Sequence, residues 1–355
     1  MLSPIILFVY DRPEHTRQTL EALAVNTLAQ ESELIVYADG VKDGASEGQI
    51  EKIWRTREVV RSRQWCKNVT VIESDRNKGL AASIIFGVTE TVNLYGTVIV
   101  LEDDIVTGRH FLEYMNAALR KYKDKRQVWH ITGWRDPVRK AKEGGSYFYP
   151  TMDCWGWATW ADRWRYFKKD AAYYQSTFTD EMKFHFNIEG SEEGMWGQIE
   201  DNISGRLDTW AIFWYATIFL NGAGRGLCLA PTRSLVRNIG LDNSGEHCGK
   251  DSMRVIKDSI DFRGEHFPDE LRVDQSEYEK NIRFLFDRRR VLPSRKCTNM
   301  IKRIIKKPLR PVYHAIKRLC AKMNGGGYCV TRNSNSAIIS ISCSRLHCVF
   351  VREAA

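Results

Sequence analysis

The sequence predicts an α/β fold with a mostly parallel, Rossmann-like sheet that is flanked by helices. Short apolar runs alternate with helical patterns through the first half of the chain. The run Thr97–Leu101 is apolar almost without interruption, as expected for a strand buried on both faces. With 355 residues, 43% hydrophobic and 11% aromatic, the chain is long enough for one large domain with an appendage, and its composition excludes a mainly disordered protein.

The elements of the first half follow one another in a regular order. The expected strands are Pro4–Tyr10, Leu34–Asp39, Val69–Glu73, Thr97–Leu101 and Val128–Thr132. The expected helices are Glu14–Ala24, Glu47–Arg63, Leu80–Leu94 and Arg109–Lys121. Pro13 lies near the first position of the first helix, where its missing N–H costs nothing.

The second half is rich in tryptophan. We expect most of these rings to fill the core, while those beside Gly or Asp in turn-like sequence can stack on a sugar. Gly156 permits close backbone approach, so we expect Trp157 near a site, and Trp160 and Trp164 in the core.

We expect a main domain over residues 1–287, with halves at 1–135 and 136–287. A basic, amphipathic helical tail at 288–323 and a poorly ordered segment at 324–355 follow. The net charge is +9, and thirteen of the 53 basic residues lie between Arg288 and Lys322. Because apolar residues interleave with these charges, the tail is expected to lie on an anionic membrane surface. The alternative is a solvated run of charge.

The start of the chain has no pattern of a signal peptide, and no apolar run is long enough to span a membrane. The nine cysteines show no metal-ligand spacing, which is typical of reduced thiols. We therefore expect a cytoplasmic protein, peripheral to the plasma membrane through its tail.

Polar residues follow the expected strands at the points where they end. The first strand ends in Tyr10-Asp11-Arg12, the second in Asp39, and the fourth runs into Glu102-Asp103-Asp104. A basic turn with Arg76 and Lys78 opens the third helix. Because ligands bind at the C-terminal edge of such sheets, we expect a divalent cation with a phosphorylated substrate there, and a diphosphate at the helix N-terminus. The alternative is a solvated acidic turn.

These stretches resemble the GT-A glycosyltransferases, particularly bacterial family 2-like sugar transferases and, more distantly, the N-acetylglucosaminyltransferase that begins complex N-glycans. The resemblance covers residues 3 to 250. It rests on Tyr10-Asp11-Arg12, Asn77-Lys78-Gly79-Leu80, Leu101-Glu102-Asp103-Asp104, and Gly156-Trp157 followed by Trp164. It implies a GT-A fold, with nucleotide-sugar binding in residues 1–135 and acceptor and metal binding in 136–287. It also implies metal-dependent, inverting transfer from a nucleotide-diphospho-sugar, with UDP-sugars favoured, to a glycan or lipid-linked acceptor of surface polysaccharide synthesis.

The resemblance also implies roles for single residues. Asp104 would ligate Mn²⁺ or Mg²⁺, Asp103 would contact ribose or a metal-bound water, and Glu102 the donor sugar. The other donor-binding residues would be Tyr10, Asp11, Arg12, Asp39, Arg76, Lys78 and Trp157. The acidic run departs from a strict DxD motif, which leaves the division of labour between 103 and 104 open.

Two further residues come from the second half. The stretch Pro231–Cys248 looks like a loop that folds back over the donor in the bacterial transferases, and His247 would complete the metal sphere there. The alternative for His247 is a hydrogen-bonding surface residue. Asp208 is expected to open a helix and to act as the catalytic base that takes the acceptor proton. Its alternative is helix N-capping, and Glu200, Asp201 and Asp153 are alternative bases.

Two other functions would explain part of the sequence. A sugar-phosphate nucleotidyltransferase would carry a Gly-rich basic loop after the first strand, where this chain has Asp11-Arg12-Pro13-Glu14. A nucleic-acid-binding protein would explain the basic tail but not three clustered acids, so we expect no nucleic-acid partner.

Overall fold

The computed structural model describes residues 2–138, 144–192, 194–222, 226–242, 253–256, 258–264, 266–291, 328–332, 338–343 and 346–351. The chain divides into two compact units, Met1–Phe284 and Leu285–Ala355. Each unit is described by itself.

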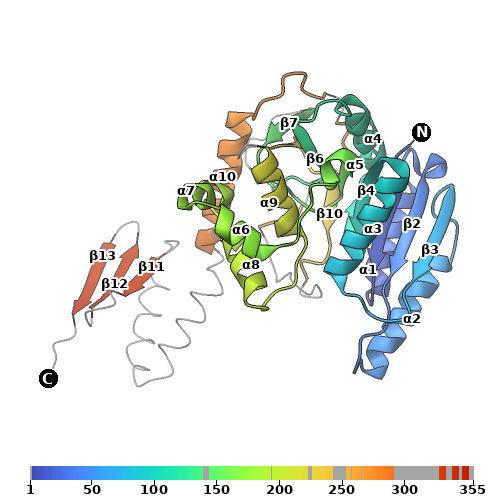
Figure 1. The fold of residues 1–355 in the computed structure, drawn as a ribbon, viewed down its shortest axis with the longest axis horizontal. Coiled ribbons are helices and arrows are strands. Elements are labelled where there is room, and N and C mark those ends of the chain that lie inside the picture. The colour runs from blue at the N-terminus through green and yellow to red at the C-terminus, as the bar shows by residue number, and fades with distance from the viewer. Residues whose placement is uncertain are drawn as a thin grey trace. The chain divides into compact units, whose positions relative to one another are not determined.

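The first unit is built on an eight-stranded sheet with the order β3-β2-β1-β4-β8-β6-β9-β7 (Figure 1). Its strands are β1 Ile5–Val9, β2 Glu33–Ala38, β3 Asn68–Glu73, β4 Thr97–Glu102, β6 Val128–Thr132, β7 Ser146–Tyr149, β8 Trp157–Trp160 and β9 Leu227–Pro231. Strands β1 to β4 are parallel, and so are β6 and β9, whereas β8 and β7 run antiparallel to their neighbours. Because β8 is antiparallel to both β4 and β6, those two strands end at the same edge of the sheet. The predicted mostly parallel sheet is confirmed.

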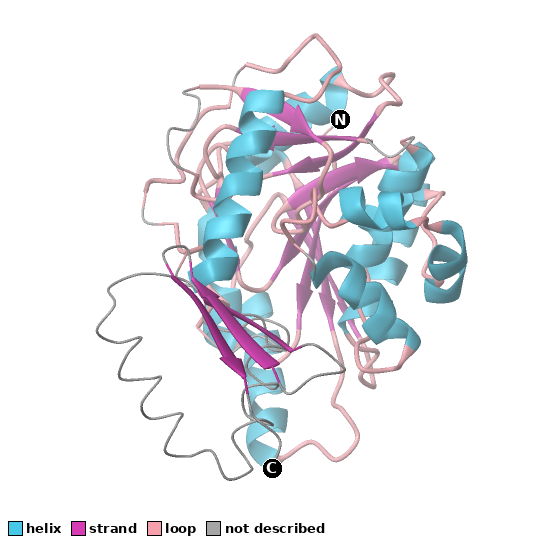
Figure 2. Ribbon diagram, turned by 90° about the vertical axis from the view of Figure 1, so that its left-hand side faces the viewer, coloured by secondary structure: helices cyan, strands magenta, loops and turns pink. Residues whose placement is uncertain are grey.

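Helices cover both faces of this sheet (Figure 2). They are α1 Pro13–Ala24, α2 Glu47–Arg61, α3 Leu80–Tyr95, α4 Phe111–Lys121, α5 Ala161–Trp164, α6 Ala171–Thr177, α7 Asp180–Phe186, α8 Gly194–Ile203, α9 Ala211–Asn221 and α10 Gln275–Val291, with a 3₁₀ turn η1 at Ala29–Glu31. The four helices predicted in the first half agree with α1 to α4 within two residues at each end. Pro13 occupies the first turn of α1, as expected. None of the described helices combines the length and the apolar character needed to cross a bilayer.

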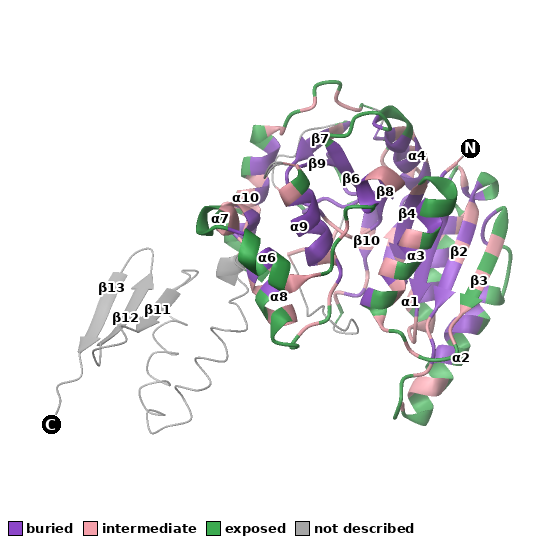
Figure 3. Ribbon diagram, viewed as in Figure 1, coloured by how far each residue is buried: buried purple, intermediate pink, exposed green. Residues whose placement is uncertain are grey.

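The central strands of the first unit are deeply buried (Figure 3). All five residues of β1 are at most 4% exposed, and Val98 to Leu101 of β4 at most 1%. Each large aliphatic side chain buried in this way contributes about 1.5–3 kcal/mol to the hydrophobic term. The strand ends are therefore held on a rigid layer, which is what a precise site requires.

A short second sheet brings a distant segment to the end of β4. Strand β5 (Ile105–Thr107) pairs antiparallel with β10 (Val236–Asn238), so that Asn238 lies opposite Ile105. The backbone N–H of Ile239 then donates to the carbonyl oxygen of Asp104 at 2.9 Å. Residues 236–242, which we name the covering segment, are thus joined to the acidic end of β4.

The second unit holds a three-stranded antiparallel sheet: β11 Tyr328–Arg332, β12 Ile338–Cys343 and β13 Leu346–Val351. These strands lie within residues 324–355, where we expect a poorly ordered segment, and that expectation remains a prediction. The alternation of Ile339 and Ile341 with Ser340 and Ser342 is a period-two pattern typical of a strand. The expected basic tail begins within α10, which ends at Val291, and residues 292–327 lie outside the described part of the chain.

Candidate active site

Arg12 and two carboxylates form a charged cluster where β1 and β4 end. The Arg12 guanidinium donates to both oxygens of Asp103, through Nη2 to Oδ1 and through Nε to Oδ2 at 3.4 Å. Its Nη1 donates to Oδ2 of Asp104 at 3.0 Å. The side chains of Arg12, Asp103 and Asp104 are 20%, 5% and 9% exposed. We name these three residues the acid–arginine cluster.

Three carboxyl groups at the end of β4 face one guanidinium, and two of them have raised pKa values. Burial raises the pKa of Asp103 to about 7, although the charge of Arg12 acts in the opposite direction. Burial and the charges of Asp104 and Asp103 raise the pKa of Glu102 to about 8. The arrangement therefore favours an additional cation at this edge.

Gly240 of the covering segment lies directly against the acid–arginine cluster. A Cβ atom at this position would overlap Oδ2 of Asp104 and would lie 3.0 Å from Nη1 of Arg12. The N–H of Gly240 donates to Oδ1 of Asn238 at 2.8 Å, and Asp242 forms an ion pair with His15 of α1 at 3.4 Å. The segment is thus fixed at both ends above Asp104.

Asp39 organises the basic turn that precedes α3. Its carboxylate accepts the backbone N–H groups of Gly40 and Lys78 at 2.8 Å and that of Gly79 at 3.0 Å. It also accepts from the Asn77 amide at 3.0 Å. Because this carboxylate is occupied by the turn, Asp39 serves first as a brace for the N-terminus of α3.

The side chains of the turn itself point outward. Arg76 and Lys78 are exposed, and the Lys78 ammonium lies 5.2 Å from the centre of the Phe86 ring. No side chain caps α3 at Gly79. The first-turn N–H groups of α3 and the two basic side chains are therefore available to an anion.

Tyr10 and Asp11 follow β1 and are half-buried. Oδ2 of Asp11 accepts from Nε2 of Gln49 in α2 at 3.0 Å, and the charge of Asp11 contributes to the raised pKa of Asp103. The structure therefore brings Asp11, Arg12, Asp103 and Asp104 to one place, as their strand-end positions predicted.

Arg57 of α2 is a supporting residue that sequence reasoning missed. Its side chain is 9% exposed, and Nη2 donates to the carbonyl oxygens of Asp39 at 3.1 Å and Ser74 at 2.8 Å. Nη1 pairs with Glu73 at 3.3 Å. In the sequence it looks like any other basic residue on an amphipathic helix, so no local signal marks it as the bridge between β2 and β3.

Trp157 does not lie against an open site. Its side chain is 0% exposed, and its ring stacks between His130 and Trp210, with centroids 5.3 and 5.2 Å away. Trp160 and Trp164 are buried, as predicted. The ring that we expected at a ligand is therefore packed in the same layer as the core tryptophans.

Asp208 lies in the loop that joins α8 to α9, residues 204–210, which we name the Asp208 loop. Its carboxylate is 77% exposed and forms an ion pair with Lys169. We expect Asp208 to open a helix, but α9 begins at Ala211 with Trp210 in the N-cap position. The N-capping alternative for Asp208 is therefore wrong, and its carboxylate is presented to solvent.

The alternative bases have other partners. Glu200 is exposed on α8, and Asp201 accepts from Nε of Arg206 at 2.9 Å. Asp153 accepts from the Tyr149 hydroxyl, and burial raises its pKa to about 6. His247 lies outside the described residues, so its two interpretations remain predictions.

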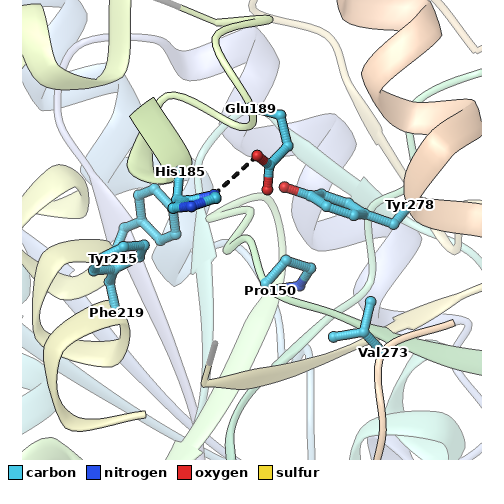
Figure 4. A pocket seen from close by; sticks show the side chains of 7 residues that line it. All are labelled: Pro150, His185, Glu189, Tyr215, Phe219, Val273 and Tyr278. Atoms are coloured by element: carbon cyan, nitrogen blue, oxygen red, sulfur yellow. Dashed lines mark hydrogen bonds and ion pairs between the residues drawn. The ribbon is translucent and has the colours of Figure 1, made fainter. Parts of the chain in front are cut away.

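A small hollow lies among α7, α9 and α10, and Pro150, which follows β7, contributes to it (Figure 4). Nδ1 of His185 lies 2.9 Å from Oε2 of Glu189, and the Tyr278 hydroxyl points toward the same carboxylate. Pro150, Tyr215, Phe219 and Val273 complete the lining. None of the residues predicted for the active site contributes to it.

The strand-end residues fit a metal ion only in a particular way. In the described part of the chain, no three Asp, Glu, His or Cys side chains converge where an ion could sit. However, Mg²⁺ is commonly held by one or two carboxylates together with water and substrate phosphates. Of the two Asp104 carboxylate oxygens, Oδ2 accepts a hydrogen bond from Arg12. Within the described residues Oδ1 has no such partner, which leaves it for a cation. The residues therefore fit a site that a phosphorylated substrate completes.

No protein-family model and no curated protein sequence matches the chain. Among solved structures, S. aureus TarS 1–349 matches with 12% identity and a TM-score of 0.35, over 66% of this chain and 60% of that one. The galactosyltransferase LgtC, in complex with donor and acceptor sugar analogues, matches with 11% identity and a TM-score of 0.32, over 64% and 73% of the two chains. Mouse xyloside xylosyltransferase 1 matches with 12% identity and a TM-score of 0.32, over 63% and 83%. The last two are glycosyltransferases by name.

Proposed function

We propose that the protein is a metal-dependent glycosyltransferase that uses a nucleotide-diphospho-sugar, with a UDP-sugar as the favoured donor. The observation that carries this proposal is the meeting of Arg12, Asp103 and Asp104 at the C-terminal edge of a parallel sheet, beneath Gly240. Ligands of open α/β sheets bind at this edge. A purely structural role of the acid–arginine cluster would not explain two features beside it. These are the N-terminus of α3, which no side chain caps, and the basic turn that Asp39 holds.

The donor diphosphate would be bound by this chain's cations and N–H dipoles. Arg76 and Lys78 supply positive charge, and the first turn of α3 supplies N–H groups that have no capping side chain. Asp39 keeps that turn in shape through its three backbone hydrogen bonds. Asp11 and Tyr10, at the end of β1, would contact the base and ribose of the nucleotide.

Asp104 would hold Mn²⁺ or Mg²⁺ together with the donor phosphates, and Asp103 would contact ribose or a metal-bound water. When bound, such a cation offsets the charge that develops on the departing nucleoside diphosphate. Arg12 holds both carboxylates in fixed directions, so they need little reorganisation when the donor arrives. Glu102 is proposed for the donor sugar, and His247 for the metal.

Asp208 is proposed as the base that takes the proton from the acceptor hydroxyl. Its exposure of 77% supports this role, because an acceptor arriving from solvent can reach the carboxylate. The transfer is proposed to be inverting, as the family resemblance implies. The acceptor is proposed to be a glycan or lipid-linked sugar of surface polysaccharide synthesis, such as lipopolysaccharide. The enzyme would then be cytoplasmic and peripheral to the membrane through its basic tail.

A thermal-shift panel of UDP-, dTDP- and GDP-sugars with and without Mn²⁺ tests the donor and the metal together. A ligand that binds only the native state raises the melting temperature. We expect the largest shift for a UDP-sugar with Mn²⁺, and a small shift for Mn²⁺ alone because the donor completes the metal site. Salt-sensitive RNA binding without any nucleotide-sugar effect would contradict the proposal.

Asp104→Asn tests the carboxylate itself. We expect donor turnover to fall about 100- to 1,000-fold, the usual cost of losing one group that stabilises transition-state charge. Asp124→Asn is the control, because this exposed acid precedes β6 and lies at the opposite edge of the sheet. Normal metal-dependent turnover of Asp104→Asn would refute the assignment of Asp104.

A further inference from the structure

We propose that Asn202 is a positioning residue that holds Asp208 in place for the transfer reaction. The inference rests on the proposed function and deepens it, because it states how the chain supports an exposed base. An exposed carboxylate on a loop is a poor catalyst unless its backbone is fixed, since a displacement of about 1 Å can cost 100-fold in rate.

The side-chain amide of Asn202 makes two hydrogen bonds with Thr209, the residue that follows Asp208. Its Nδ2 donates to Oγ1 of Thr209 at 3.0 Å, and its Oδ1 accepts the backbone N–H of Thr209 at 3.1 Å. Nδ2 also donates to the carbonyl oxygen of Gln198 at 2.8 Å, which anchors the amide to α8. Thr209 is therefore gripped by both its side chain and its backbone.

The other parts of the Asp208 loop are fixed as well. The carbonyl oxygen of Asp201 accepts the N–H groups of Arg206 at 2.9 Å and Leu207 at 3.2 Å. On the far side, the Trp210 ring stacks on Trp157, with the ring planes 21° apart. Trp157 lies opposite Val100 of β4, two residues before Glu102. The loop is thus joined through its aromatic end to the strand that carries the acids.

The Asp208 side chain differs from its surroundings. Its partner within the described chain is Lys169, whose side chain is 30% exposed, and such a surface pair contributes little. The backbone on both sides of Asp208 is fixed while its carboxylate is accessible. This is the arrangement expected of a group that must meet an incoming substrate at a defined point.

The alternative role of Asn202 is purely structural, as a residue that ends α8. A structural role predicts lower stability and fewer active molecules. A positioning role predicts a lower kcat for each molecule that binds nucleotide, with the donor KM unchanged. The two roles are separated by measuring the stoichiometry of UDP binding by calorimetry on the full-length protein.

The test uses four variants in transfer assays. We expect Asn202→Ala to lower kcat about 10- to 100-fold, and Thr209→Val to lower it about 3- to 10-fold because one hydrogen bond is lost. Thr209→Ser restores the hydroxyl and should behave like the wild type. Arg206→Ala is the matched control, since it removes an exposed ion pair of the same loop and should change kcat less than about twofold.

A double-mutant cycle with Asp208→Asn decides whether Asn202 acts through Asp208. If it does, Asn202→Ala has almost no further effect once the carboxylate is gone. An equal loss in both backgrounds, or a normal kcat for Asn202→Ala, would overturn the inference. Full activity of Asp208→Asn, or a wild-type protein that transfers no sugar, would instead refute the proposed function and the inference with it.

Discussion

The strand-end site and the buried aromatic layer formed by Trp157, Trp214 and His130 differ in the exposure of their side chains. At the ends of β1 and β4, Arg12, Asp103 and Asp104 pair with one another and keep some exposure. Between β8 and α9, Trp157, Trp214 and His130 are fully buried. Charged groups at parallel strand ends are brought together by the topology of the sheet, whereas the place of an aromatic ring is decided by packing. The first kind of position follows from a short sequence rule. The second does not always do so, because Trp160 and Trp164 are buried as predicted whereas Trp157 is buried where we expect a ligand.

Trp157→Ala is the strongest test of this difference. If the ring is core, its removal leaves a cavity and lowers the free energy of unfolding by about 3–5 kcal/mol, measured by urea denaturation. UDP binding by the molecules that remain folded should be little changed. Trp54→Ala is the control, because that ring is 52% exposed and its loss should matter by less than about 0.5 kcal/mol. Unchanged stability with lost UDP binding would show that Trp157 contacts the donor after all.

The strand-end residues were predicted because a short rule covers them. Tyr10, Asp11, Arg12 and Asp39 follow apolar runs, and the ends of parallel strands meet at one edge. The same rule gives no help with Trp157, since a tryptophan after a glycine fits a sugar platform and a core layer equally well. Only the packing of Trp157 against His130 and Trp210 decides between them.

Other features depend on contacts between segments distant in sequence. Arg57 reaches the carbonyl oxygens of Asp39 and Ser74, and Gly240 lies on Asp104. The contacts of Arg57 have no local pattern, whereas Gly240 lies in the stretch Pro231–Cys248, which the resemblance implies folds back over the donor. Asn202 and Thr209 are seven residues apart, and their pairing depends on how the Asp208 loop turns. Sequence therefore predicts that the strand-end acids meet, but not which residues hold them.

Gly240→Ala tests the contact between the backbone of the covering segment and the charged side chains of Asp104 and Arg12. The added methyl group would overlap Asp104 Oδ2 and lie 3.0 Å from Arg12 Nη1, so the covering segment or the carboxylate must move. We expect about a 100-fold loss in kcat/KM for the donor, equivalent to about 2.7 kcal/mol. Gly48→Ala is the matched control, because a Cβ there meets nothing within 4 Å. Equal activity of the two variants would show that the covering segment takes no part in the site.

The two regions should also respond to pH in opposite directions. Burial and neighbouring acids raise the pKa of Glu102 to about 8. Below that pH the folded state keeps a proton on Glu102 that the unfolded state has already released. The free energy of unfolding therefore falls as pH rises toward 8. Burial lowers the pKa of His130 to about 3. The unfolded state then binds the extra proton, so stability is lost as pH falls through 6.5 toward 3.

The pH effect of His130 on the free energy of unfolding is the smallest of the predicted effects. It is also the most direct to interpret, because two hydrogen-bond partners fix the tautomer of His130. Nε2 donates to the carbonyl oxygen of Asp153 at 2.9 Å, and Nδ1 accepts from the Trp214 indole at 3.2 Å. Lowering the pH from 7 to 5 should cost about 2 kcal/mol through this group alone. His130→Gln should therefore show a shallower loss of stability over that interval in urea denaturation, whatever its stability at pH 7. His266→Gln is the control, because that imidazole is exposed and its removal should leave the slope unchanged. Equal slopes for the wild type and His130→Gln would mean that His130 is protonated in the folded state, and that the aromatic layer accommodates a charge as the strand-end site does.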